Sequence, residues 1–229
     1  MRASKWILVA AVAALVALPA AAQPPFGRGG MRGGAGMLLG NPGVQKELKL
    51  TEEQTKKVQE LVTKNGEKMR EAFQAGDQEK TQEVMKEIAT ETDKFIKDNL
   101  NADQQKRLKQ IQRQQMGPGA FADEETAKEL KLTDEQKEDI KKINEDLGSQ
   151  MREAFQGVDF QDQEARQAAQ KKVQGIRKEA MEKITKMLTP EQKKAWKDLT
   201  GDPFEVQFGP GRGGFGGGKG GKGKKQDKE

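Results

Sequence analysis

The sequence predicts an all-α protein made of two tandem helical hairpins, and three observations support this prediction. The pentapeptide LTEEQ at residues 50–54 returns as LNADQ at 100–104, LTDEQ at 132–136 and LTPEQ at 188–192. Between the pentapeptides, apolar residues recur at spacings of three and four, which is the period of an amphipathic helix. The segments KELKLTEEQ and MREAFQ of the first half recur 82 residues later as KELKLTDEQ and MREAFQ. Such repetition indicates one structural unit that occurs twice.

Residues 1–22 have the pattern of a secretory signal peptide. Arg2 and Lys5 precede an apolar run at residues 6–18, and three alanines end at Ala22, after which we expect cleavage. The run is shorter than the ~20 residues that span a membrane. We therefore expect a periplasmic or secreted protein that does not span the membrane. The chain has no cysteine, so it can form neither a disulfide nor a lipoprotein anchor.

Composition shifts suggest the boundaries of the two units. We expect a flexible Gly/Pro-rich segment at 23–43, a first unit at 44–116, a linker at 117–122, a second unit at 123–204 and a disordered Gly/Lys-rich tail at 205–229. The whole chain carries a net charge of +5, but residues 44–204 carry −2, so the basic character belongs to the two ends.

Within each unit, the elements follow from the apolar pattern and from the pentapeptides. A helix over residues 52–74 and a second over 77–99 are expected to form an antiparallel hairpin, with a third, shorter helix starting at the second pentapeptide. The second unit repeats this order. A hairpin brings the first and second pentapeptides of a unit to one end and places MREAFQ at the other. The two units are then expected to form a pseudo-dimeric, elongated bundle.

Each pentapeptide has the chemistry of a helix start. Its threonine, or Asn101 in the second case, is a good N-cap, and the glutamine three residues later completes a capping box. The leucine before the cap lies outside the helix and is expected to fill the seam between helices. The motif residues are Leu50, Thr51, Gln54, Leu100, Asn101, Gln104, Leu132, Thr133, Gln136, Leu188, Thr189 and Gln192.

At these residues the chain resembles the LTxxQ-motif family, the Spy/CpxP-like periplasmic chaperones and stress regulators. The resemblance covers roughly residues 44–200 and implies a cradle-shaped dimer that holds unfolded proteins without ATP. Here both subunits would be fused in one chain through GPGAF at 117–121. The implied function is binding of unfolded or stress-damaged envelope proteins. The alternative is a structural or regulatory module for one specific envelope partner, such as a stress or metal-resistance regulator.

Two groups of residues are candidates for contact with such clients. The MREAFQ segments combine apolar and basic side chains, which suits an adaptable surface for apolar, acidic segments; the alternative is that they pack the hairpin turn. A second basic group follows Asn101, and its alternative role is a solvated face. The candidates are Met69, Arg70, Phe73, Met151, Arg152 and Phe155 in the first group, and Lys106, Arg107, Lys109 and Arg113 in the second.

Other functions find less support in the sequence. The basic tails suit weak contact with anionic envelope polymers, and export argues against nucleic acid as a partner. Without histidine or cysteine there are no ligands of the kind that zinc or copper prefers, so we expect no metal site and no cofactor. There is no histidine base or thiol, and the carboxylates lie among lysines on polar faces. We therefore expect no enzymatic activity.

Overall fold

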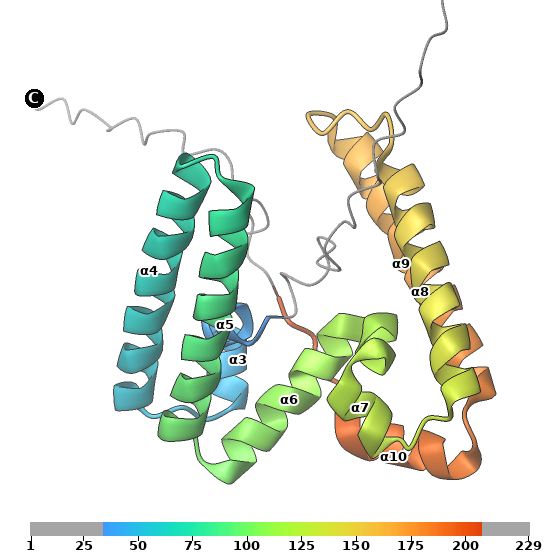
Figure 1. Ribbon diagram of the computed structural model, residues 1–229, viewed down its shortest axis with the longest axis horizontal. Helices are drawn as coiled ribbons and strands as arrows, with labels where there is room; N and C mark the ends of the chain where they lie inside the picture. The colour runs from blue at the N-terminus through green and yellow to red at the C-terminus, as the bar shows by residue number, and fades with distance from the viewer. Residues whose placement is uncertain (1–33, 208–229) are drawn as a thin grey trace, which may run out of the picture.

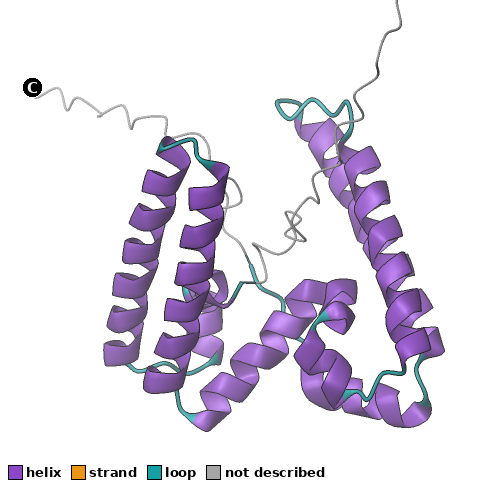
Figure 2. Ribbon diagram, viewed as in Figure 1, coloured by secondary structure: helices purple, strands orange, loops and turns teal. Residues whose placement is uncertain are grey.

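A computed structural model describes residues 34–207, and within that range all regular secondary structure is helical (Figure 2). The predicted all-α class is therefore confirmed. The predicted signal peptide, residues 23–33 and residues 208–229 lie outside the described residues. The elements in order are α2 (Ala35–Leu39), α3 (Pro42–Glu47), α4 (Glu52–Gln74), α5 (Gln78–Asn99), α6 (Ala102–Met116), the 3-10 helix η1 (Gly117–Ala122), α7 (Glu124–Glu129), α8 (Asp134–Phe155), α9 (Gln163–Met187) and α10 (Pro190–Thr200).

The long helices stand in two antiparallel pairs at opposite ends of the molecule (Figure 1). α4 packs along α5, and α8 packs along α9. Between the bases of the pairs lie α6, η1, α7 and α10, and α10 packs against α6. The chain after α10 returns toward α3, so the last described residues lie beside the first helix pair. The two pairs diverge from this shared base.

All four pentapeptides begin helices in the way their chemistry predicts. The side-chain oxygens of Thr51, Asn101, Thr133 and Thr189 accept a hydrogen bond from the backbone N–H of the glutamine three residues later. Each glutamine side chain in turn accepts from the backbone N–H of its cap. The capping boxes are thus confirmed at α4, α6, α8 and α10. Each satisfies two backbone donors that the first turn of a helix leaves unpaired.

The apolar core consists of two clusters, one at the base of each helix pair. The first contains Leu38, Leu39, Val44, Leu48, Val58, Leu100, Leu108, Ile111 and Val206. The second contains Phe121, Ala127, Leu130, Leu132, Ile140, Ile184 and Leu188. Three pentapeptide leucines are buried in these clusters and Leu50 packs against the first, as the seam-filling interpretation predicts.

Three segments that the sequence assigned to flexible or linking chain belong to the core. Leu38 and Leu39, at the end of the predicted flexible segment, are fully buried on α2. Phe121 of the predicted linker is buried at η1, and Val206 of the predicted tail is 8% exposed in the first cluster. The composition prediction is wrong at these positions because one or two apolar side chains among glycines anchor the backbone without producing any periodicity.

Candidate functional site

The glutamines of the two pentapeptides in each unit bind one another. Gln54 and Gln104 form a reciprocal pair in which each side-chain Nε2 donates to the other's Oε1 at 3.0 Å. Gln54 Nε2 also donates to the carbonyl of Asn99 at 2.7 Å. Each Oε1 also accepts the hydrogen bond of its own capping box. The side-chain amide of Gln54 therefore connects the start of α4 to the end of α5 and to the start of α6.

The second unit repeats this pair. Gln136 and Gln192 exchange hydrogen bonds at 2.9 Å, and Gln136 Nε2 donates to the carbonyl of Met187 at 3.0 Å. Gln192 also reaches the carbonyl of Lys131, whose φ of 51° places it in the left-handed region. Sequence reasoning predicted the capping role of these glutamines but missed the pairing. The signal was present, because a hairpin brings both pentapeptides of a unit to the same end.

The MREAFQ segments lie at the ends of the helix pairs farthest from the shared base. Met69 is half-buried, while Arg70 and Phe73 are exposed near the end of α4. In the second unit, Phe155 is half-buried and stacks on Phe160, with ring centroids 6.0 Å apart. Phe160 is 53% exposed, and the sequence analysis did not single it out.

The remaining predicted tip residues are buried to the same degree as their counterparts in the first unit. Met151 is half-buried and Arg152 is exposed on α8. The structure does not bring the two tips together, because the helix pairs diverge from their shared base (Figure 1).

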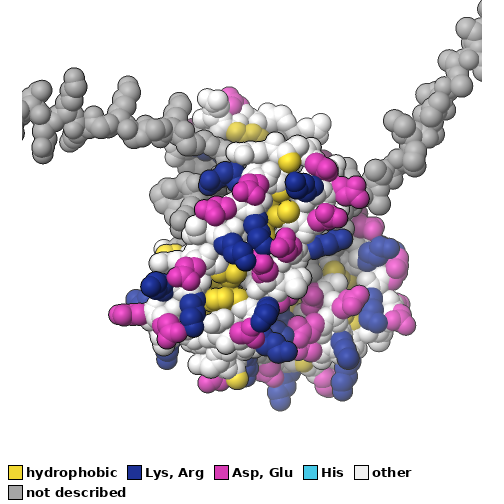
Figure 3. All heavy atoms as spheres, turned by 60° about the vertical axis from the view of Figure 1, so that its left-hand side comes forward, with side chains coloured by type: hydrophobic (Ala, Val, Ile, Leu, Met, Phe, Trp, Pro, Cys, Tyr) yellow, Lys and Arg dark blue, Asp and Glu magenta, His cyan; other side chains and the backbone are white. Residues whose placement is uncertain are grey.

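Beyond the core clusters, each helix pair, α4–α5 or α8–α9, has no third helix of the described chain packed on it. Apolar side chains on these helices are therefore left partly exposed. Val62 on α4 is 38% exposed. Apart from residues packed against the core clusters, the larger half-buried apolar residues on these helices include Leu61, Met69, Val84, Met85, Ile88, Met151, Phe155 and Ile176. Figure 3 shows apolar side chains between interleaved acidic and basic ones on the face it presents. Residues 34–207 carry 31 basic and 34 acidic side chains, a net charge of −3.

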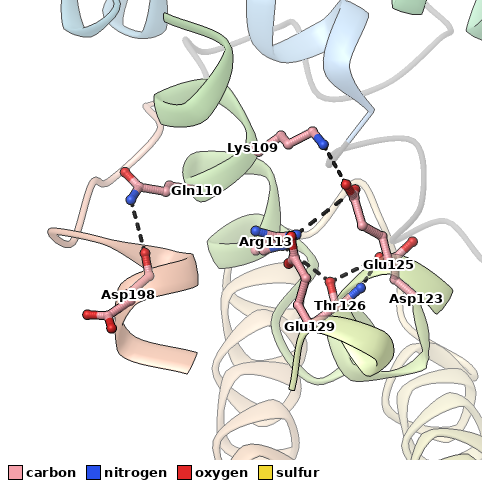
Figure 4. Close-up of polar contacts among 8 residues, drawn as sticks. All are labelled: Lys109, Gln110, Arg113, Asp123, Glu125, Thr126, Glu129 and Asp198. Atoms are coloured by element: carbon pink, nitrogen blue, oxygen red, sulfur yellow. Dashed lines mark hydrogen bonds and ion pairs between the residues drawn. The ribbon is translucent and has the colours of Figure 1, made fainter. Parts of the chain in front are cut away.

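The predicted basic group on α6 is largely occupied by partners within the chain. Arg113 is 8% exposed and donates to Thr126 and to the carboxylate of Glu129 (Figure 4). Lys109 forms an ion pair with Glu125 at 2.7 Å. These contacts hold α7 against α6.

The other two members of the group differ from one another. Arg107 pairs with Glu47 at 2.7 Å, which connects α6 to α3. Lys106 is exposed. The four residues therefore do not form one shared basic face, and three of them stabilise the packing of short helices on α6.

A groove of about 370 Å³ opens on the first unit between α4 and the α2–α3 region. It is lined by Gly40, Pro42, Gln45, Val58, Gln59, Val62 and Thr63. None of these residues is charged, in a chain in which 34% of residues are. The equivalent positions 82 residues later include Glu124, Lys141 and Glu145. The two units therefore differ in charge at this face.

The first helix pair is joined by an ion-pair network midway along its length. Lys68 contacts both Glu87 and Glu91, and Lys64 contacts Glu91. Hydrogen bonds from Lys68 and then Lys64 lower the pKa of Glu91. Hydrogen bonds to Glu87 and Glu91 raise the pKa of Lys68. In the second pair, Asp146 and Gln150 replace the two lysines.

In residues 34–207, no group of three or more acidic side chains is placed to hold a metal ion. Within the same range, no helix combines the length and the apolar character needed to cross a bilayer.

Comparison with known proteins gives one similarity. Residues 120–196 match a family described as a domain of unknown function, DUF4890. The matched range runs from η1 to α10 and covers most of the second unit. No curated protein and no solved structure matches the chain.

Proposed function

We propose that this protein is an exported, non-enzymatic chaperone that binds unfolded or stress-damaged envelope proteins without ATP. In this proposal the two helical units act as a fused, dimer-like cradle of the Spy/CpxP type. The observation that carries the proposal is the partial exposure of apolar side chains along both helix pairs. Apolar side chains left partly exposed along two helices can contact apolar segments of another protein.

The side chains on the two helix pairs are suited to binding many different clients. Met69, Met85 and Met151 are half-buried on the two helix pairs, and methionine side chains adapt to differently shaped apolar groups. Charges of both signs surround the apolar side chains, so neither acidic nor basic client segments are excluded by a field of one sign.

A light-scattering assay tests this proposal. Two unrelated denatured proteins are diluted into buffer with and without the full-length mature chain, in the absence of ATP. We expect the chain to reduce the aggregation of both clients at near-equimolar ratio. The variant Met69→Lys/Met151→Lys should lose this effect, whereas Thr90→Lys/Gln170→Lys, which adds the same charge at exposed polar positions of α5 and α9, should retain it. Unchanged scattering for both clients would contradict the proposal.

The second candidate function is a structural or regulatory module for one specific envelope partner. The uncharged groove on the first unit favours it, because only one of the two units has this surface. A single partner segment would be expected to fit one groove, whereas a general chaperone would use both helix pairs. Suppression of aggregation for one client and not for unrelated ones would favour this candidate.

A further inference from the structure

We propose that the first unit contains a binding site for an extended peptide, and that the C-terminal arm (defined as residues 201–207) occupies this site within the same chain. The ligand class is an extended segment with two apolar side chains two residues apart. The inference deepens the proposed function and rests on it for the natural source of such peptides. Its starting point is the contacts of the arm.

The arm has the form of a bound peptide. It has no regular secondary structure, and from Pro203 to Gln207 its side chains alternate between the surface and the protein. Phe204 and Val206 point inward and pack with the first core cluster, although they lie more than 90 residues from its other members in sequence. Pro203, Glu205 and Gln207 are exposed. This alternation is how an extended ligand presents every second side chain to a surface.

Side-chain amides of the first unit bind the backbone of the arm. Gln114 Nε2 donates to the carbonyls of Thr200 and Asp202 at 2.6 and 2.8 Å, and Gln114 Oε1 accepts from the N–H of Phe204 at 2.8 Å. Farther along, Asn41 Nδ2 donates to the carbonyl of Gln207 at 2.9 Å.

A third side chain that binds the backbone of the arm is an arginine. Arg107 donates to the carbonyl of Asp202 at 2.9 Å. Backbone contacts of this kind can form with a peptide of any sequence, whereas the pockets for the two apolar side chains determine which sequences bind.

The start of the arm is fixed by a glycine. Gly201 ends α10 with a φ of 60°, a conformation that favours glycine, and a Cβ at this position would overlap the side-chain amide of Gln110. The chain can therefore turn sharply from α10 onto the surface of the first unit. Because this tether is short, the arm competes at a high effective concentration with any peptide from outside.

The linker shows the same arrangement in the opposite direction. Gly117 ends α6 with a φ of 59°, and the following residues carry Phe121 into the second core cluster, where its ring lies 4.1 Å from that of Trp196. The segment after each third helix thus fills the core of the other unit. The linker is continuous with α7, whereas no helix follows residues 201–207 within the described chain, so we take the arm as the segment that can be exchanged.

A peptide titration on the full chain tests the inference. The probe is a fluorescent peptide with the sequence GDPFEVQ, and the control probe carries serine at both apolar positions. We expect Phe204→Ser/Val206→Ser to bind the probe at least tenfold more tightly than the wild-type chain does, because its own arm no longer competes. Adding Gln114→Ala to this variant should reduce the affinity by about tenfold, since the two backbone contacts that Gln114 makes with Asp202 and Phe204 are lost. Neither chain should bind the control probe.

Equal affinity of the wild-type chain and the arm variant for the probe would overturn the inference. If circular dichroism shows that the double variant loses helix content, the single variant Phe204→Ala, at a half-buried position, takes its place in the same comparison. Client aggregation is measured on the same proteins. Peptide binding without client protection would contradict the proposed function alone, and client protection without peptide binding would contradict this inference alone.

Discussion

Replacing Gln104 with alanine tests whether the paired glutamines, rather than the helix caps alone, fix the base of the first helix pair. Gln104 is 7% exposed. Its Oε1 accepts from the backbone N–H of Asn101 at 3.0 Å, and its side chain makes both hydrogen bonds of the reciprocal pair with Gln54. The substitution removes all three of these hydrogen bonds.

The expected loss follows from these contacts. A net contribution of ~1 kcal/mol for each hydrogen bond gives about 3 kcal/mol. Gln54 keeps its contacts with Thr51 and Asn99, so no buried polar group is left without a partner. The better helix propensity of alanine returns a few tenths of a kcal/mol. We therefore expect Gln104→Ala to lower the free energy of unfolding by about 2–3 kcal/mol.

Urea unfolding followed by circular dichroism measures this quantity. The matched control is Gln170→Ala, the same substitution at an exposed position within α9, which should change the free energy of unfolding by less than ~0.5 kcal/mol. A loss of below ~1 kcal/mol for Gln104→Ala would show that the capping box alone accounts for the glutamine. The reciprocal pair would then have no structural role.

Three further outcomes are expected. Phe121→Ala should lower the free energy of unfolding by about 3–5 kcal/mol, since it empties a fully buried site beside Trp196, and urea unfolding measures this loss. Arg113→Ala should cost about 1–3 kcal/mol in the same assay, because it leaves Glu129 and the buried hydroxyl beside it without their donor. Acid should loosen the first helix pair. The lowered pKa of Glu91 stabilises the fold above the ordinary value of 4.5, and this stabilisation is lost as the pH falls through the lowered pKa. Amide hydrogen exchange in α4 and α5 would detect the loss.

The sequence predicted best what depends on neighbouring residues. The four capping boxes, the bounds of α4 and the buried pentapeptide leucines all follow from side chains within about one helical turn of each other. At the candidate site, the sequence also predicted that the MREAFQ segments lie at the far ends of the helix pairs. A hairpin of two helices of equal length fixes where its turn lies.

Contacts between distant segments could not be predicted in this way. Arg107 and Arg113 looked like members of one basic group because their partners, Glu47 and Glu129, lie 60 and 16 residues away. The pattern of charges along α6 contains no information about which acidic side chains the fold brings near. Phe160 was missed for a related reason, because it lies in a turn where no helical period marks it.

The same limit explains why three core segments were assigned to flexible chain, and it bears on how the two units are held together. Leu38, Leu39 and Val206 come from opposite ends of the described chain, yet they pack in one cluster. The first unit therefore needs residues beyond α10 to complete its core, and the second needs Phe121 from the segment that follows α6. The third helix of each unit, α6 or α10, ends at a glycine with positive φ. In both units this glycine allows the chain to turn toward the core of the other unit. We therefore expect the two units to be coupled in stability through these exchanged segments, although the helix pairs themselves diverge.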